Sequence, residues 1–177
     1  MKTKIFIILF LILIINTTFV FAGNYGGDLK IKVELRPFNL NPLYTANETE
    51  LMISKQIFDT LVTYNNQDEI IANLADSWEI NSDSNIFKFQ LKKDVYFHPY
   101  KIDGEVVPLN KRKVSAKDWK WSFEYLAASE NKSLKADLFN KVKGYAEYRS
   151  GQSSQISGIR VKNKYQLEIE LTEAYEP

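Results

Sequence analysis

The clearest periodic pattern lies between Ala75 and His98, where apolar and polar side chains alternate in two short runs. The apolar members of these runs are Trp78 and Ile80, then Phe87, Phe89 and Leu91. Residues 81–85 between the runs are polar, so the pattern predicts two half-buried strands joined by a turn. Val95 and Phe97 form a third apolar pair, which is expected to continue the same meander.

Two further segments show the same alternation. The first contains Leu29, Ile31, Val33 and Leu35, which predicts a strand with one buried face over residues 29–35. The second lies on either side of a turn at Asn163 and Lys164, near the end of the chain. Its apolar positions are Ile159 and Val161 before the turn, and Tyr165, Leu167, Ile169 and Leu171 after it. This second pattern predicts a closing hairpin.

A helix is predicted to begin at Asn47, because its side chain can accept hydrogen bonds from the free amides of a first turn. Glu48 and Glu50 would place negative charge at the positive end of the helix dipole. The inward stripe of this helix is expected to consist of Ile53, Ile57, Phe58 and Leu61.

A second helix is predicted after Ser115, because Ser115 and Asp118 have the spacing of a capping box. Trp119, Phe123, Leu126 and Ala127 follow at helical spacing and are expected to face the core. Trp121 and Tyr125, four residues apart on the flank, are expected to be exposed aromatics.

A third helix is predicted near Leu134 to Tyr148. Its inward side chains are expected to be Leu138, Phe139, Val142, Tyr145 and Ala146. Periodicity assigns no element to residues 99–113, which are expected to be a loop. With strands and helices both present, the predicted fold class is α+β, a mixed α/β arrangement.

The composition is that of a folded protein. The chain has 177 residues, of which 45% are hydrophobic and 14% aromatic, so it can bury a core and is not expected to be disordered. This length fits one large domain or two small ones.

The first 22 residues have the features of a secretory signal peptide. Lys2 and Lys4 precede the apolar run Ile5–Ile15, and the small residue Ala22 precedes the expected cleavage site. The mature protein is therefore expected to begin at Gly23. An uncleaved membrane anchor is the alternative, but the apolar run is shorter than the roughly 20 residues of a spanning helix. Because the sequence has no cysteine, neither a disulfide nor a lipid-modified cysteine is expected, and the mature chain is predicted to be soluble in the periplasm or outside the cell.

The charge balance implies no strong electrostatic partner. The formal net charge is +1, and removing the two lysines of the leader leaves 21 basic and 22 acidic side chains. Residues 111–113 form a dense basic cluster, but no repeated aromatic platform accompanies it, so no nucleic-acid partner is expected.

Catalytic and metal-binding motifs are not found in the sequence. His98 is the only histidine, and a lone histidine after a strand is interpreted as structural. The sequence has no phosphate-binding glycine loop, dinucleotide fingerprint, nucleophile elbow or zinc-protease motif, and no acid–base pair of carboxylates can be nominated. We therefore expect no enzymatic activity, no metal site and no cofactor, and a binding module is favoured over an enzyme.

A set of short motifs occurs in order along residues 26–177. The main one is LADSWE at 74–79, an acidic turn, and FKFQLKKDVYFH at 87–98. Supporting motifs are GGDLK at 26–30, LNP at 40–42, QIFDTL at 56–61, SAKD at 115–118 with SF at 122–123, SGIRV at 157–161 and EIEL at 168–171. Together they resemble the beginning of a family 5 extracellular solute-binding protein, the group that contains the oligopeptide- and dipeptide-binding components of ABC importers.

The resemblance implies a two-lobed, periplasmic-binding-protein-like fold of type II, with only its amino-terminal part in this chain. It implies a signal peptide at 1–22, the first strand and loop of lobe I at 23–45, a smaller second lobe at 46–157, and a truncated return hairpin into lobe I at 158–177. The chain is then expected to be a fragment with an incomplete binding cleft. Residues 99–113 form a longer connection than is usual in the family, and the lipid-anchoring cysteine of many relatives is absent.

The resemblance also implies a function. The complete protein would be the extracytoplasmic solute-binding component of an ABC importer, a monomer that closes over a peptide or other small solute and presents it to a membrane permease. The alternatives are a nickel- or oligosaccharide-binding member of the same family, or a secreted enzyme or interaction domain. The segment expected to line the cleft consists of Tyr44, Thr45, Ala46, Asn47 and Glu48. The alternative interpretation of this segment, a plain strand-to-helix connection, has equal weight.

Overall fold

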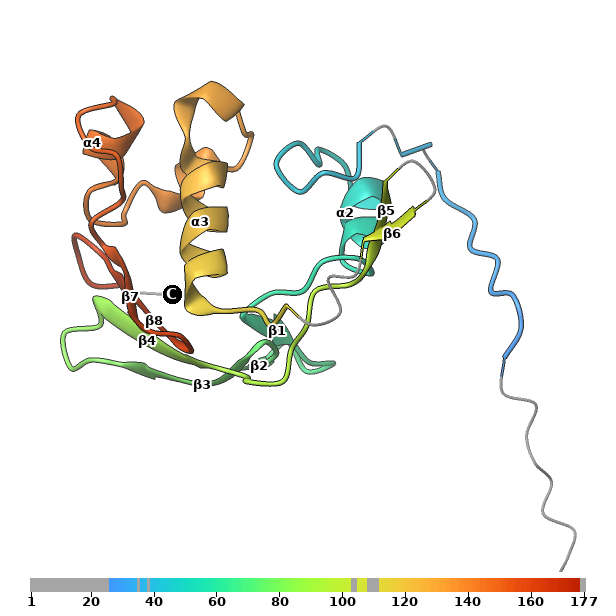
Figure 1. Ribbon diagram of the computed structural model, residues 1–177, viewed down its shortest axis with the longest axis horizontal. Coiled ribbons are helices and arrows are strands. Elements are labelled where there is room, and N and C mark those ends of the chain that lie inside the picture. The colour runs from blue at the N-terminus through green and yellow to red at the C-terminus, as the bar shows by residue number, and fades with distance from the viewer. Residues whose placement is uncertain (1–25, 35, 38, 103–104, 108–111, 176–177) are drawn as a thin grey trace, which may run out of the picture. The chain divides into compact units, whose positions relative to one another are not determined.

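The computed structural model describes residues 26–34, 36–37, 39–102, 105–107 and 112–175. The predicted signal peptide at 1–22 therefore lies outside the described residues. The chain divides into two compact units, Met1–Val33 and Glu34–Pro177. Figure 1 shows the elements of the second unit, which contains all the helices and strands described below.

The described part of the first unit, residues 26–33, contains no strand, so the predicted strand at 29–35 is wrong for these positions. Leu29 is 85% exposed and Ile31 is also exposed, although the sequence alternates as predicted. Alternation defines an apolar face, but a strand also needs a neighbour to which its main chain can hydrogen-bond. Residues 26–33 have no such neighbour in the described part of the chain.

The centre of the second unit is a four-stranded antiparallel sheet. It consists of β3 (Ala75–Ile80), β4 (Ile86–Leu91), β7 (Ile159–Asn163) and β8 (Gln166–Glu170), in the order β3-β4-β8-β7. Trp78 lies opposite Phe89 in the first hairpin, and Phe89 lies opposite Leu167 where the two hairpins meet. Both hairpins predicted from alternation are confirmed.

The third strand predicted for the first meander is wrong. The second neighbour of β4 is β8, and the segment containing Val95 and Phe97 leaves the sheet. Here Tyr96 forms an isolated antiparallel bridge with Lys113. Beyond this bridge, the segment expected to be a loop contains a further hairpin, β5 (Tyr100–Ile102) with β6 (Glu105–Val107).

The first helix, α2 (Glu48–Ser54), begins where predicted but is shorter than the predicted stripe. Asn47 caps it, because its side chain accepts the Glu50 N–H at 2.9 Å. Ile57 and Phe58 lie beyond the helix end and are exposed, so their predicted inward positions are wrong. The chain then forms a two-stranded hairpin from β1 (Val62–Tyr64) and β2 (Ile70–Ala72).

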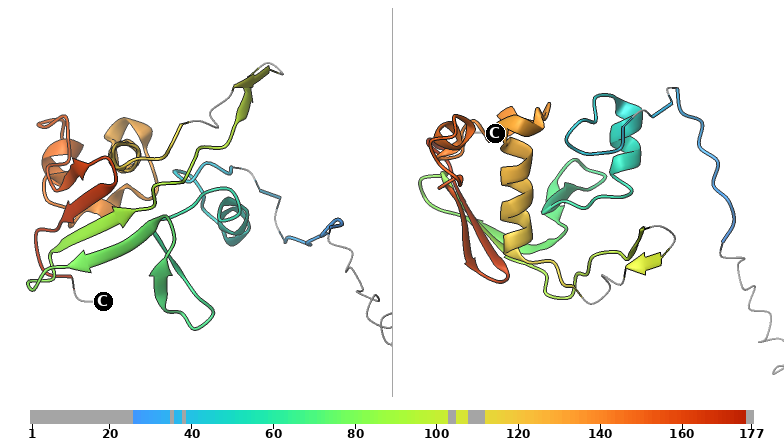
Figure 2. Two further views of the ribbon diagram at one scale, coloured as in Figure 1. Left: turned by 60° about the horizontal axis from the view of Figure 1, so that its bottom comes forward. Right: turned by 45° about the horizontal axis from the view of Figure 1, so that its top comes forward.

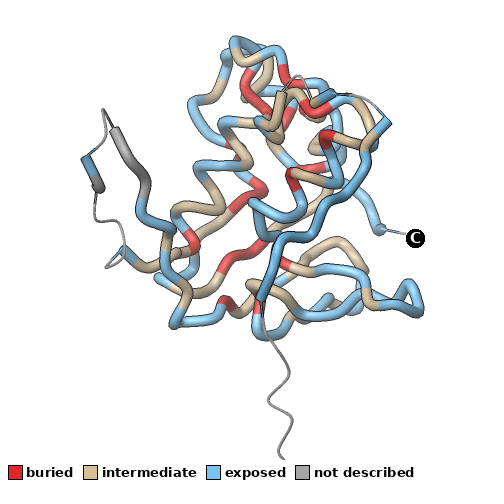
Figure 3. Tube along the Cα trace, turned by 90° about the vertical axis from the view of Figure 1, so that its right-hand side faces the viewer, coloured by how far each residue is buried: buried red, intermediate tan, exposed pale blue. Residues whose placement is uncertain are grey.

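The second helix, α3 (Ala116–Ala127), packs on one face of the sheet, against β7 and β8 (Figure 2). Its predicted capping box is confirmed, because the Asp118 carboxylate accepts the Ser115 N–H at 2.8 Å. Trp121 is 63% exposed and its ring stacks on that of Tyr125, with centroids 4.8 Å apart, so these two are the exposed aromatics expected. Between helix and sheet lies a core of ten buried residues: Leu61, Ala75, Leu91, Ala116, Ala127, Val142, Tyr145, Ile156, Ile159 and Leu167 (Figure 3).

The single helix predicted near Leu134 to Tyr148 is wrong. The structure has two 3-10 turns, η1 (Ser129–Asn131) and η2 (Ala136–Phe139), followed by a short helix, α4 (Tyr145–Arg149). Gly144 separates η2 from α4 with a left-handed φ of 80°. Because the chain changes direction there, Leu138 and Ala146 are exposed rather than inward, while Val142 and Tyr145 are buried as predicted.

Candidate ligand-binding loop

The segment from Asn39 to Asn47, which we call the cleft loop, is held at both ends by Glu50. The Glu50 carboxylate is buried in the first turn of α2 and accepts the Asn39 N–H at 3.0 Å and the Ala46 N–H at 2.9 Å. A buried carboxylate is stable only when hydrogen bonds replace its water, and here those bonds come from the loop main chain. Glu50 therefore fixes the shape of the cleft loop.

A turn at Pro42 gives the middle of the cleft loop its bend. The Asn41 side chain accepts the Leu43 N–H at 3.1 Å, and the Asn41 carbonyl accepts the Tyr44 N–H at 2.9 Å. Asparagine favours turns because its side chain hydrogen-bonds to nearby main chain, and proline favours them because its ring fixes φ. The turn brings Tyr44 and Thr45 to face residues 131–135.

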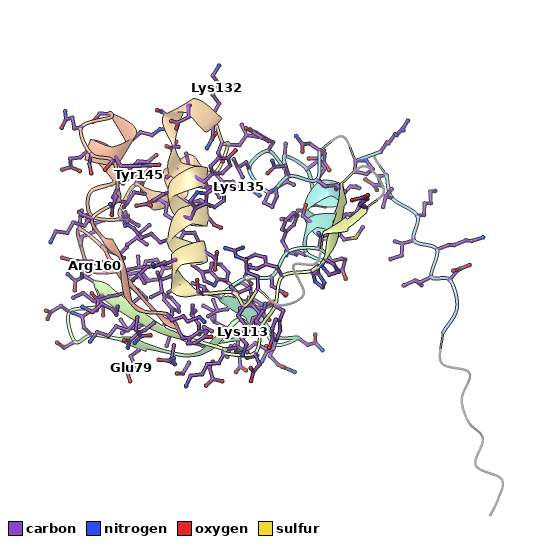
Figure 4. All side chains as sticks on the ribbon, in the orientation of Figure 1. Glu79, Lys113, Lys132, Lys135, Tyr145 and Arg160 are labelled. Carbon is purple, nitrogen blue, oxygen red and sulfur yellow. The ribbon has the colours of Figure 1, made fainter. Side chains whose placement is uncertain are left out.

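Residues 131–135, from the last residue of η1 to the residue before η2, form the facing segment of the site. The Tyr44 hydroxyl donates to the Asn131 carbonyl at 2.8 Å, and the Ser133 hydroxyl donates to the Leu43 carbonyl at 3.0 Å. The Lys135 ammonium donates to Thr45 Oγ1 at 2.5 Å. In Figure 4, Lys135 is labelled beside α3 on the side of the cleft loop, and Lys132 is labelled at the top of the view, directly after η1. Two segments about 90 residues apart in sequence thus form one polar site.

Buried polar side chains are concentrated at this site. In the described part of the chain five polar residues are buried, and four of them are Thr45, Glu50, Ser54 and Ser133. The fifth, Glu168, belongs to the sheet, where it pairs with Arg160. Because burying polar groups is costly, each of these four side chains is hydrogen-bonded at the site.

Thr45 has main-chain groups without an internal partner. Its N–H and its carbonyl form no hydrogen bond with any residue that the structure describes, although the residue is only 7% exposed. The same holds for the carbonyl of Ala46. An extended ligand could bond to such groups as a strand bonds to a sheet edge.

The five residues predicted to line the cleft have different positions. Tyr44 and Thr45 face residues 131–135, and Ala46 is exposed. Asn47 caps α2, and Glu48 is exposed on its first turn. Their role as cleft residues stays a prediction. Sequence reasoning missed the facing residues Asn131, Ser133 and Lys135, because no periodic pattern or motif connects them with the cleft loop.

A network of ion pairs lies on the sheet, away from the cleft loop. Arg160 donates to Glu168 and Glu170, and Lys143 donates to Glu170 at 2.7 Å. The hydrogen bond from Lys143, followed by that from Arg160, holds the pKa of Glu170 below its ordinary value. A shallow hollow of about 540 Å³ beside this network is lined by residues that include Lys120 and Arg160. Both cations are already paired with carboxylates.

No group of three or more His, Cys, Asp or Glu side chains in the described part of the chain could hold a metal ion. His98 is exposed just before β5. Of the helices that the structure describes, none has the length and apolar character needed to cross a bilayer.

The fold matches that of bacterial binding proteins. It is similar to the Haemophilus influenzae OppA structure in complex with RPPGFSPFR, with a TM-score of 0.65 and 20% identity, covering 77% of this chain and 25% of that one. It is also similar to Campylobacter jejuni NikZ in complex with Ni(L-His), with a TM-score of 0.59 and 24% identity, covering 81% of this chain and 24% of that one. At these identities the likeness defines the fold, which is the mixed α/β fold of one part of a periplasmic binding protein.

The sequence comparison defines the family. The profile described as "Bacterial extracellular solute-binding proteins, family 5 Middle" matches residues 69–177, and the chain belongs to this family. It is 25% identical over 129 residues to the oligopeptide-binding protein SarA of Streptococcus gordonii, which covers 73% of this chain. The chain spans only 18% of the length of that relative. The resemblance deduced from the ordered motifs is thereby confirmed.

Proposed function

We propose that this chain belongs to the solute-binding component of an ABC importer, which binds peptides outside the cytoplasmic membrane and delivers them to a membrane permease. The observation that carries the proposal is the family match over residues 69–177. The similarity to an oligopeptide-binding protein favours peptides among the possible solutes. In this role the protein is a binding protein and not an enzyme.

The cleft loop supports a peptide ligand on physical grounds. A peptide in extended conformation presents alternating N–H and carbonyl groups along each edge. The N–H and carbonyl of Thr45 and the carbonyl of Ala46 have no hydrogen-bond partner among the described residues, so they could bond to such an edge. Main-chain recognition of this kind is independent of ligand sequence, which suits a protein that transports many peptides.

The proposal includes secretion. The leader at 1–22 would direct export and be removed before Gly23, and the mature protein would lie in the periplasm or at the cell surface without a lipid anchor. It would act as a monomer and have no nucleic-acid partner. These points rest on the sequence alone.

The division into lobes also stays a prediction. We propose 23–45 as the beginning of lobe I, 46–157 as the smaller lobe and 158–177 as the return towards lobe I. In the described residues, β8 of the last range hydrogen-bonds to β4 of the preceding one. The two ranges therefore share a sheet, whichever lobe contains it.

Two alternatives within the family are a nickel-binding and an oligosaccharide-binding protein. The structural similarity to C. jejuni NikZ, solved with Ni(L-His), is the observation in favour of nickel. A secreted enzyme or a non-transport interaction domain is the alternative from another class.

Titration calorimetry tests the proposal. The protein as its gene encodes it is titrated with a pool of short peptides, with Ni(L-His) and with cello-oligosaccharides. Heat with the peptide pool alone is the expected result. Heat with nickel or oligosaccharide alone selects the corresponding alternative, hydrolysis of the peptides identifies an enzyme, and no heat with any ligand contradicts the transport function.

A further inference from the structure

Among the residues that the structure describes, Lys135 has no counter-charge. Lys135 is half-buried as a residue, and its ammonium donates to Thr45 Oγ1 at 2.5 Å but forms no ion pair with any described carboxylate. The other half-buried lysines of the described part are both paired, Lys113 with Asp94 at 2.8 Å and Lys120 with Glu124 at 2.7 Å. Partly burying a lysine without a counter-charge is unfavourable, so an anion bound beside Lys135 would be stabilised.

The position of Lys135 connects this charge with the proposed ligand. Its ammonium contacts the side chain of the same residue, Thr45, whose main-chain N–H and carbonyl have no described partner. One residue of an extended chain covers about 3.3 Å, so a peptide that bonds to Thr45 places its neighbouring groups within reach of the ammonium. A lysine ammonium has three donor hydrogens, and Thr45 uses only one of them.

The facing segment holds Lys135 in this position. The Lys135 N–H donates to Ser133 Oγ at 3.2 Å, and the Ser133 hydroxyl in turn bonds to the Leu43 carbonyl. The Leu134 N–H donates to the same carbonyl at 3.2 Å. Because three successive residues are bonded to the cleft loop, the Lys135 side chain begins from a fixed backbone. Lys132 differs, since it is exposed and lies in a left-handed conformation at the end of η1.

We infer that Lys135 is an anion-binding residue of the cleft loop, which selects ligands with a carboxylate next to the main chain bound at Thr45. The carboxylate belongs either to the free carboxyl terminus of a short peptide or to an acidic side chain. This inference rests on the proposed peptide-binding function and adds a charge preference to it. Because hydrogen bonds to charged groups contribute more than neutral ones, the preference for a carboxylate over a neutral amide should be about tenfold or more in Kd.

The test compares matched ligand pools on matched variants. Four proteins are titrated: the protein as its gene encodes it and the variants K135M, K135R and K132M. The first pool of short peptides has neutral side chains and a free carboxyl terminus, and the second contains the same peptides with an amidated terminus. The third and fourth pools repeat these two with one alanine of each peptide replaced by glutamate. K135M removes the charge of Lys135 and keeps the approximate length of its side chain, whereas K135R keeps the charge. K132M is the control, because it removes the charge of a nearby exposed lysine. The ratio of two Kd values is measured within one preparation, so a partly unfolded fraction cancels.

The expected result is a preference for carboxylate-containing pools in the unaltered protein, in K135R and in K132M, and its loss in K135M. A preference that needs the free carboxyl terminus identifies the terminus as the anion, and one that needs glutamate identifies the side chain. Equal binding of all pools, or an unchanged preference in K135M, overturns the role of Lys135 and leaves the peptide-binding function standing. Failure of every pool to bind overturns both.

Discussion

The Tyr44 hydroxyl donates to the main-chain carbonyl of Asn131 at 2.8 Å, across 87 residues of sequence. This bond joins the cleft loop, in which Tyr44 follows the Pro42 turn, to the segment that leaves α3 through η1. Asn131 is held from its other side, because its own Nδ2 donates to the Tyr125 carbonyl near the end of α3. The cleft loop is therefore connected to the helix that covers the sheet.

Substituting Tyr44 by phenylalanine removes only the donor of this bond. The Asn131 carbonyl then loses its partner, and we expect the free energy of unfolding to fall by about 1 kcal/mol. Urea denaturation followed by circular dichroism measures the change. Tyr64→Phe is the control, since the exposed Tyr64 hydroxyl forms no hydrogen bond in the described part of the chain, and equal losses in the two variants would contradict a role for the bond.

Leu167 is the apolar centre of the sheet. It is fully buried in β8 and lies opposite Phe89 of β4 and Val161 of β7. Leu167→Ala should lower the free energy of unfolding by about 2–5 kcal/mol, because the substitution removes buried methyl groups and leaves a cavity. Leu138→Ala, at a side chain that is 76% exposed, should change it by less than about 0.5 kcal/mol. Similar denaturation midpoints for the two variants would mean that the sheet does not form the core.

Local sequence rules predicted the elements whose causes are local. The alternation around Trp78, Phe89 and Leu167 predicted both hairpins, because side chains on one face of a strand recur every second residue. The Asn47 cap and the Ser115 capping box were predicted because a cap depends on residues within one helical turn. These rules say where an element begins and which face is apolar.

The errors concern partners and breaks in the chain. Alternation does not specify which strand pairs with which, so Val95 and Phe97 were assigned to a sheet whose next strand comes from Gln166–Glu170. Residues 29–33 alternate equally well and have no described neighbour. The prediction of one helix across Gly144 was wrong, because the apolar pattern is periodic on both sides of Gly144 although the backbone turns there.

The candidate site also has a part that the sequence could predict and a part that it could not. Residues 44–48 were selected because they resemble a family segment, and their contacts within α2 follow from the Asn47 cap and Glu50. The contacts of Lys135 and Ser133 with the cleft loop could not be predicted, because they depend on how α3 packs on the sheet. Contacts over about 90 residues of sequence depend on the whole fold.

The ion pairs of Glu170 make stability depend on pH. Lys143 and then Arg160 lower the pKa of Glu170 from its ordinary value of 4.5, so the charged form stabilises the folded state. Such a contribution is complete above about pH 4.5 and is lost as the pH falls through the lower pKa of the folded state. Glu170→Gln should therefore destabilise the chain at neutral pH, and its difference from the unaltered chain should shrink in acid.

Urea denaturation at about pH 7 and about pH 3 measures this difference. Glu147→Gln is the control, because Glu147 is exposed on α4 and its side chain forms no ion pair in the described residues. A difference between Glu170→Gln and the unaltered chain that stays constant over this pH range would exclude the charge of Glu170 as its cause.

Alanine substitutions at Gly144 and Gly151 distinguish the free-energy cost of a left-handed backbone from the cost of a steric clash. Both have a left-handed φ, 80° and 79°, so alanine costs about 1–2 kcal/mol at either position. At Gly144 the added Cβ would lie 2.3 Å from Ser157 Oγ and 2.8 Å from the Ser157 nitrogen, whereas at Gly151 it would meet nothing within 4 Å. Gly144→Ala should therefore lower the free energy of unfolding by about 1–3 kcal/mol more than Gly151→Ala, in parallel urea titrations. Equal losses would mean that residues 144 and 157 move apart without cost, and that the contact between Gly144 and Ser157 is looser than the structure indicates.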